Sequence, residues 1–188
     1  MDDLNRRGAL RLAAGCMALS LFAASGAALA EDPLEREVKA AYLYKFGSFV
    51  EWPEASFARP DSPLQIGVAG DDALADQLVR TVTGRSVAGR PIAVRKLRSG
   101  EAPGALHILF VSGHDRAAAA DMLKAVRGQP VLTVSDTEEA LAAGAMVSFV
   151  VAGGKLRFLV AMGPVAPSRL RISARMLAAA LRVQPGVS

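Results

Sequence analysis

LHILFVSGHDRAAAADMLKAVRGQPVLTVS (residues 106–135) holds two apolar segments separated by an alanine-rich one. LHILFVS is almost continuously apolar, which is typical of a strand buried on both faces of a parallel sheet. DRAAAADMLKAV predicts a helix and PVLTVS predicts a second strand. Strands that alternate with helices form βαβ crossovers, so this stretch indicates an α/β fold with a mostly parallel sheet.

The same alternation extends towards both ends of the chain. Before residue 106 we expect a helix over residues 34–50, a strand in LQIGVAG, a helix over residues 73–82 and a strand in RPIAVRKL. After residue 135 we expect a short helix through Ala143, two strands in MVSFVVAGGKLRFLVAM and a helix capped by Ser173. Gly153 and Gly154 supply the positive φ angles of a hairpin turn. We therefore predict a three-layer α/β sandwich with a mixed, mostly parallel sheet and a late antiparallel hairpin.

The N-terminus has the pattern of a secretory signal peptide. Three arginines precede an apolar run that ends in the small-x-small motif Ala28-Leu29-Ala30. We predict a cleaved signal peptide over residues 1–30, of Sec or twin-arginine type, and one domain over residues 31–188. Cys16 is the only cysteine, so the exported chain is expected to have no disulfide and no thiol nucleophile.

No catalytic or metal-binding motif is evident. The chain has two histidines, His107 and His114, and no HExxH or GxSxG pattern. We interpret His107, inside an apolar strand, as structural. Ser135-Asp136 follows a strand and is read either as a helix cap or as part of a site. We predict no catalytic residues, no metal and no cofactor. If a small molecule binds, the candidate residues are those at strand ends, namely Gly70, Ser112, Ser135 and Asp136.

AAYLYKFGSFVEWP (residues 40–53) contains both tyrosines and the only tryptophan of a chain that is 5% aromatic. In the helix predicted over residues 34–50, one core-facing stripe is approximated by Val38, Tyr42, Lys45 and Phe49. Other apolar residues lie outside that stripe, namely Leu43, Tyr44, Phe46 and Val50. A helix that is apolar on more than one face must be covered on both sides. The cover is either this chain itself or another subunit or partner.

Basic residues gather near the C-terminus. No acidic residue follows Glu139, whereas Arg169, Arg171, Arg175 and Arg182 do. These arginines form either a solvated face or a patch for an acidic partner or a membrane surface. No basic run with interleaved aromatic residues occurs, so nucleic-acid binding is not expected.

Several segments, taken in order, resemble the YfiR family of periplasmic proteins. VKAAYLYKFGSFVEWP is similar to the opening signature of that family. LQIGVAGDDALADQL, VAGRPIAVRKL, HILFVSG, PVLTVSD, GAMVSFVVAGGKLRFLV and RLRISARMLAAAL continue the similarity over residues 34–183. The resemblance implies a small periplasmic α/β protein, dimeric in described members, that binds the periplasmic domain of a membrane diguanylate cyclase and holds it inactive. Other chains with this domain are associated with sensor kinases. Described members also carry redox-active cysteines, which the exported form of this chain would lack.

We therefore predict an exported regulatory binding protein, not an enzyme. Its partner is expected to be an inner-membrane signalling protein, either a diguanylate cyclase or a sensor kinase, and we expect a homodimer. Binding energy at protein interfaces is concentrated in a few aromatic and arginine side chains. The interface candidates are Tyr44, Phe46, Phe49, Trp52, Arg169, Arg171 and Arg175. The alternative is a periplasmic small-molecule-binding protein.

Overall fold

A mixed β-sheet organises the chain in the computed structural model, which describes residues 32–98 and 100–186. The predicted signal peptide and Cys16 lie outside the described residues. Eight strands pair in the order β10-β8-β7-β6-β5-β2-β4-β3. Their bounds are β2 Leu64–Ala69, β3 Ser86–Val87, β4 Arg90–Leu97, β5 Ile108–Val111, β6 Leu132–Ser135, β7 Val147–Ala152, β8 Lys155–Ala161 and β10 Arg182–Gln184.

The central strands of the sheet are parallel. β4, β2, β5, β6 and β7 pair in parallel along the sheet, whereas β7 and β8 form an antiparallel hairpin. Gly153 and Gly154 make its turn with φ angles of 59° and 69°. The predicted mixed, mostly parallel sheet with a late hairpin is therefore confirmed. Two strands of this eight-stranded sheet were not predicted: β3, which pairs antiparallel with β4, and β10, which pairs parallel with β8.

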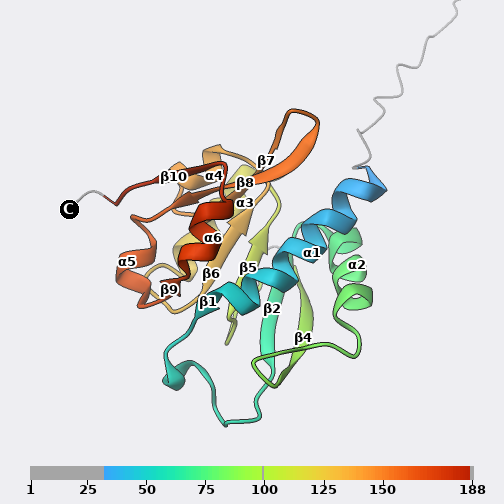
Figure 1. Cartoon of the computed structure of the whole chain (residues 1–188), viewed down its shortest axis with the longest axis vertical. Helices are drawn as coiled ribbons and strands as arrows, with labels where there is room; N and C mark the ends of the chain where they lie inside the picture. The colour runs from blue at the N-terminus through green and yellow to red at the C-terminus, as the bar shows by residue number, and fades with distance from the viewer. Residues whose placement is uncertain (1–31, 99, 187–188) are drawn as a thin grey trace, which may run out of the picture. The chain divides into compact units, whose positions relative to one another are not determined.

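Helices cover both faces of the sheet (Figure 1). One face carries α1, α2 and α6, and the other carries α3 and α4. The helix bounds are α1 Pro33–Phe49, α2 Asp72–Val82, α3 Arg116–Ala125, α4 Glu139–Ala142, α5 Val165–Ser168 and α6 Ala174–Ala179. A short 3-10 helix, η1, spans Glu54–Ser56, and a two-stranded ribbon joins β1 (Val50–Glu51) to β9 (Arg171–Ile172). The layers agree with the predicted three-layer sandwich.

Side-chain caps start the longer helices where the sequence indicates. Asp71 Oδ1 accepts a hydrogen bond from the Leu74 amide at 2.8 Å, and Asp115 Oδ1 accepts one from the Ala118 amide at 3.0 Å. Ser173 caps α6 in the same way. Each cap satisfies an amide that has no partner within its helix, which stabilises the helix by about 1 kcal/mol. These bonds are local, which is why the sequence predicts the starting points well.

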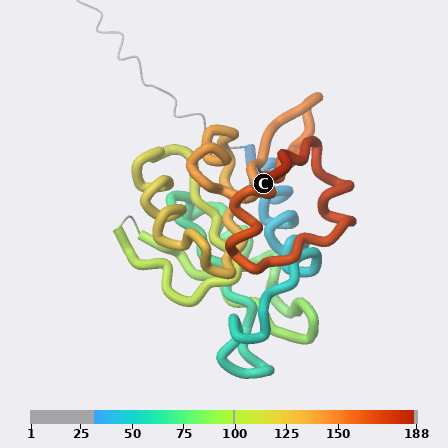
Figure 2. The backbone as a smooth tube through the Cα atoms, turned by 90° about the vertical axis from the view of Figure 1, so that its left-hand side faces the viewer, coloured from blue at the N-terminus to red at the C-terminus, as the bar shows by residue number. Residues whose placement is uncertain are grey.

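The core lies in two layers, one on each side of the sheet. On the α1 side, α1, α2 and α6 pack on the inward residues of β2, β5, β6, β7 and β8. On the other side, α3 and α4 pack on the alternate residues of the same strands. The segment from α5 to β10 runs along one side of the sheet next to β8, drawn in red in Figure 2. It brings α6 and β9 beside α1, although these elements lie far apart in the sequence.

Candidate partner-binding site

The inward face of α1 differs from the predicted stripe. The helix buries Lys39, Ala40, Leu43, Phe46 and Gly47, whereas Lys45 is exposed. The reason is that α1 packs against α2 as well as on the sheet. A Cβ atom at Gly47 would lie 3.1 Å from a methyl carbon of Leu64, so the helix approaches the sheet closely there. The chain itself covers most of both apolar faces.

Phe46 lies in the core and not on the surface. Its side chain is 1% exposed, and its ring centroid lies 5.2 Å from that of Phe158 and 6.1 Å from that of Phe149. Tyr42 extends this cluster, with its ring 5.9 Å from Phe46. Phe46 is therefore a core residue and not the exposed interface anchor that the sequence predicts, and a partner could meet it only as the buried floor of a groove.

A groove remains open between α1 and α6, which lie side by side in Figure 1. Its volume is about 450 Å³. Phe46, Phe158 and Met176 form the buried floor of this α1–α6 groove. The walls bring together three predicted interface residues: Tyr44 and Phe49 from α1, both half-buried, and Arg175 from α6, which is exposed.

The aromatic side chains of the groove are held in place by neighbours. The Arg85 guanidinium lies 5.2 Å from the centre of the Tyr44 ring, an attractive cation–π geometry. The carbonyl oxygen of Phe49 accepts a hydrogen bond from the Ser173 amide at 2.8 Å, which ties the start of α6 to the end of α1. A site on two connected helices keeps its shape better than one on a mobile loop.

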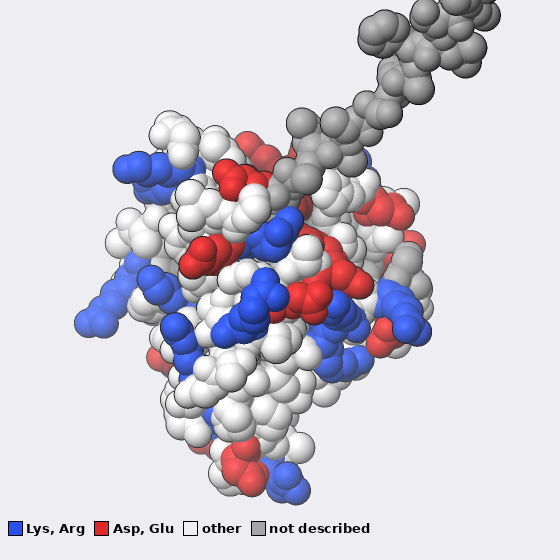
Figure 3. All heavy atoms as spheres, turned by 90° about the vertical axis from the view of Figure 1, so that its right-hand side faces the viewer, with Lys and Arg blue, Asp and Glu red and all other residues white. Residues whose placement is uncertain are grey.

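Arg169 and Arg171 do not line the groove. Both side chains are exposed, and Arg171 faces Glu51 in the β1–β9 ribbon. In residues 32–98 and 100–186, Arg169, Arg171 and Arg175 have no carboxylate within ion-pair distance. On the α2 side of the molecule, by contrast, acidic and basic side chains are interspersed (Figure 3). Of the three arginines, Arg175 therefore adds a positive charge without an ion-pair partner among these residues to the wall of the groove.

Trp52 belongs to a different cluster. Its Nε1 donates a hydrogen bond to the carbonyl oxygen of His107 at 3.1 Å. Phe57 stacks on the His107 ring at 4.2 Å, and the Arg90 guanidinium lies 3.8 Å from the centre of the Phe57 ring. Trp52 does not line the α1–α6 groove. It anchors the loop that follows β1, and His107 has the structural role that the sequence predicts.

A family model described as YfiR/HmsC-like (DUF4154) matches residues 36–180. This chain belongs to the YfiR/HmsC-like family. The match runs from α1 into the end of α6, so it includes every element that builds the groove. The family comprises periplasmic regulators of diguanylate cyclases. The comparison with curated proteins gives no match.

The alternative ligand site was predicted at the carboxyl ends of the strands. In this YfiR/HmsC-like chain, the four candidate residues there fall into two groups. α2 follows β2 and α3 follows β5 on opposite faces, which makes the β2–β5 boundary a topological switch point. Gly70 and Ser112 line a cavity of about 210 Å³ there. Ser135 and Asp136 do not line it. Ser135 is fully buried, and its hydroxyl donates to the carbonyl oxygen of Val111 at 2.8 Å.

Asp136 does not cap α4, contrary to the helix-cap interpretation. Its Oδ1 accepts a hydrogen bond from the Gly113 amide at 2.7 Å, and its Oδ2 lies 3.4 Å from Nζ of Lys39. Lys39 is 3% exposed and also pairs with Glu35 at 3.1 Å. Sequence reasoning missed this buried ammonium group, although Glu35 and Lys39 stand four residues apart, the spacing of a helical ion pair.

Within residues 32–98 and 100–186, no group of three or more His, Cys, Asp or Glu side chains is placed to hold a metal ion. Among the described helices, none has both the length and the apolar character needed to cross a bilayer.

Proposed function

We propose that this chain is an exported periplasmic protein that binds the periplasmic domain of an inner-membrane diguanylate cyclase and holds the cyclase inactive. Family membership supports the class of partner. The observation that carries the proposal is the α1–α6 groove, in which Tyr44, Phe49 and Arg175 surround an apolar floor. Repression of this kind requires a binding surface and no reaction centre.

The chemistry of the groove indicates what a partner must present. Its aromatic and arginine walls are of the residue types that contribute most to protein–protein binding. An apolar side chain of the partner would occupy the floor formed by Phe46, Phe158 and Met176. A carboxylate beside that side chain would pair with Arg175, because charge-assisted hydrogen bonds to arginine are strong. Arg171 and Arg169 would extend contact with an acidic surface.

Export by residues 1–30 and the formation of a homodimer are parts of the same proposal. Mass spectrometry of the protein recovered from the periplasm tests whether it begins at Glu31. Light scattering coupled to size-exclusion chromatography, over a series of concentrations, tests for the dimer. If Tyr44→Ala dissociates the dimer, the groove joins two copies of the chain.

Direct binding measurements test the proposed partner. The purified chain is titrated by calorimetry with the periplasmic domains of the membrane diguanylate cyclases encoded in the same genome. We expect one of them to bind, and Phe49→Ala or Arg175→Glu to weaken binding by about tenfold or more. Arg116→Glu, an exposed arginine of α3 on the opposite face, is the matched control and leaves the affinity unchanged. Binding to the periplasmic domain of a sensor kinase instead would contradict the cyclase proposal.

Cellular cyclic di-GMP provides the functional readout. Deletion of the gene is expected to raise cyclic di-GMP, and expression of the natural chain is expected to restore the original level. A Phe49→Ala chain that is exported and folded would fail to restore it. An unchanged cyclic di-GMP level after deletion would count against repression of a cyclase.

A further inference from the structure

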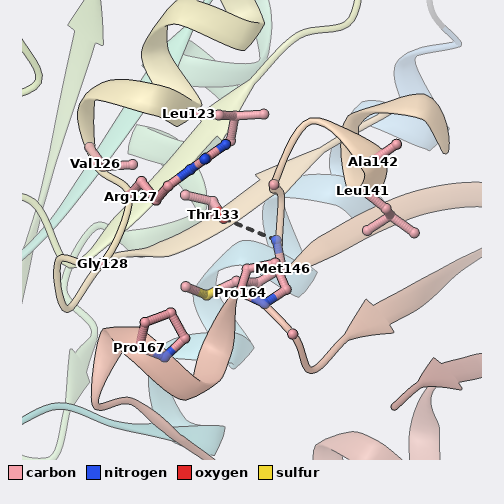
Figure 4. A pocket seen from close by; sticks show the side chains of 12 residues that line it. Leu123, Val126, Arg127, Gly128, Thr133, Leu141, Ala142, Met146, Pro164 and Pro167 are labelled. Atoms are coloured by element: carbon pink, nitrogen blue, oxygen red, sulfur yellow. Dashed lines mark hydrogen bonds between the residues drawn. The ribbon is translucent and has the colours of Figure 1, made fainter. Parts of the chain in front are cut away.

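We propose that a cavity at the edge of the sheet opposite the strand carboxyl ends binds a small carboxylic acid with an apolar body. The cavity has a volume of about 350 Å³ and lies between the end of α3, the α4–β7 turn and the β8–α5 turn. Figure 4 shows its lining side chains. This site is separate from the α1–α6 groove and from the cavity at Gly70 and Ser112.

The walls of the cavity are apolar. Leu123, Val126, Leu141 and Met146 are buried side chains with exposures of 3–8%. Pro164 and Pro167 lie on the side of the cavity opposite Leu123 and Arg127 (Figure 4). A proline has no backbone N–H, so this wall offers few hydrogen-bond donors. The greater part of any ligand must therefore be apolar.

Arg127 supplies the charged group of the site. It follows the end of α3, and its side chain extends from there past Leu123 and Thr133 (Figure 4). A Cβ atom at Gly144, across the α4–β7 turn, would lie 3.8 Å from Arg127 Nη2. Within the described ranges, no acidic side chain lies within ion-pair distance of this guanidinium. Its planar pair of N–H donors matches the two oxygens of a carboxylate.

Thr133 adds a polar group to the apolar lining. Its side chain is 3% exposed, and its Oγ1 accepts a hydrogen bond from the Met146 amide at 3.0 Å (Figure 4). A hydroxyl that accepts in this way still has its own hydrogen to donate. The site therefore has a cation and a hydroxyl donor within an otherwise apolar lining, which is typical of small-molecule sites.

Size and charge narrow the class of ligand. The volume equals about a dozen water molecules at roughly 30 Å³ each, which suits an aromatic or branched acid. A phosphate ester would need several donors, whereas the cavity lining contains one arginine and no lysine. Arg127 also suits the negative end of the α3 dipole. That effect explains a cation at the end of the helix, but it does not explain an apolar cavity beside it.

A titration with 3-phenylpropionate, followed by ¹H–¹⁵N NMR of the purified chain, tests the proposal. We expect saturable shifts of the amides of Gly128, Gly144 and Met146. The neutral amide of the same compound should bind about tenfold more weakly or worse, because it loses the charge-assisted bonds to Arg127. Absence of saturation at 10 mM, or shifts confined to α1 and α6, would overturn the proposal.

Two test variants and one control variant distinguish this site from non-specific binding. Arg127→Gln should weaken binding of 3-phenylpropionate by about tenfold or more, whereas Lys124→Gln, three residues earlier on α3, should not change it. Both side chains are exposed, so neither change should unfold the chain. Ala142→Trp, at the exposed rim of the cavity, should fill it and abolish binding while circular dichroism stays unchanged. Equal affinity in the natural chain and in Arg127→Gln would contradict the proposal, and so would binding to a folded Ala142→Trp chain.

Discussion

The backbone N–H of Gln65 donates a hydrogen bond to Nδ1 of His107 at 3.0 Å. Because Nδ1 must accept, the neutral ring carries its hydrogen on Nε2, and this group donates to the carbonyl oxygen of Ser56 at 3.1 Å. Burial lowers the pKa of His107, the bond to Ser56 acts in the opposite direction, and the charge of Arg90 lowers it further. The folded chain therefore favours the neutral imidazole.

The first prediction is a loss of stability in mild acid. His107 has a lower pKa in the folded chain than its ordinary value of 6.5. The unfolded chain therefore takes up the proton first, and the free energy of unfolding rises with pH. This stability is fully present above pH 6.5 and is lost as the pH falls below 6.5 towards the folded pKa. Urea unfolding at a series of pH values measures the loss.

A pair of variants isolates the contribution of His107. His107→Gln should lower the free energy of unfolding at neutral pH, because one of its two ring hydrogen bonds is lost. It should also flatten the dependence on pH below 6.5, because the titrating group is gone. His114→Gln, at an exposed residue, is the control and should keep the slope of the natural chain. If the free energy of unfolding of His107→Gln depended on pH below 6.5 as it does in the natural chain, His107 would not be the group responsible.

The second prediction separates the core residue of α1 from its groove residue. Phe46→Ala should lower the free energy of unfolding by about 3–5 kcal/mol, because a buried aromatic ring leaves a cavity. Tyr44→Ala should cost about 1 kcal/mol or less, because that side chain is half-buried beside the groove. Trp52 fluorescence during urea unfolding gives both values. Similar losses in the two variants would show that Tyr44 belongs to the core and is not available to a partner.

The third prediction concerns the buried charge at Lys39. Asp136→Ala should lower the free energy of unfolding by about 3 kcal/mol or more, because it leaves a buried ammonium group and the Gly113 amide without this partner. Asp76→Ala is the matched comparison. Asp76 pairs with Lys96 at 2.8 Å, but both side chains are exposed, so solvent screens the pair and the loss should be much smaller than in Asp136→Ala. Equal losses, measured by urea unfolding, would mean that solvent screens both pairs alike.

The fourth prediction concerns the close packing of two leucine side chains against Gly67 in β2. A Cβ atom at Gly67 would lie 2.6 Å from a methyl carbon of Leu106 and 2.9 Å from one of Leu97. Gly67→Ala should therefore destabilise the chain by about 1–3 kcal/mol through overpacking. Gly84 is not a suitable control, because its φ angle of +72° would strain an alanine regardless of space. Leu106→Ala combined with Gly67→Ala should lose less stability than the sum of the two single changes.

Local patterns in the sequence were sufficient for the fold class and for the longer helices and strands, but not for short elements such as β3 and β10. The β4 bounds Arg90–Leu97, the start of α3 after Asp115 and the Gly153-Gly154 turn all agree with the structure. Each depends on neighbouring residues: alternation along a strand, a side chain that caps a nearby amide, or glycines that adopt positive φ. The spacing of Met176, Leu177, Ala180 and Leu181 predicts a last helix that reaches Leu181, which is longer than α6. α6 ends at Ala179, because Leu181 already pairs its amide with the Phe158 carbonyl next to β10.

The sequence alone determined that this is an α/β chain with an aromatic first helix and an arginine-rich end. The tertiary structure alone decided which side of α1 is buried, because that depends on where α2 and α6 pack. It moved Phe46 into the core, left Tyr44 and Phe49 at a groove, and placed Arg175 beside them. It also gave Asp136 its partners, Gly113 and Lys39. Contacts between residues distant in the sequence depend on how the layers pack. The local pattern of apolar and polar residues does not predict that packing.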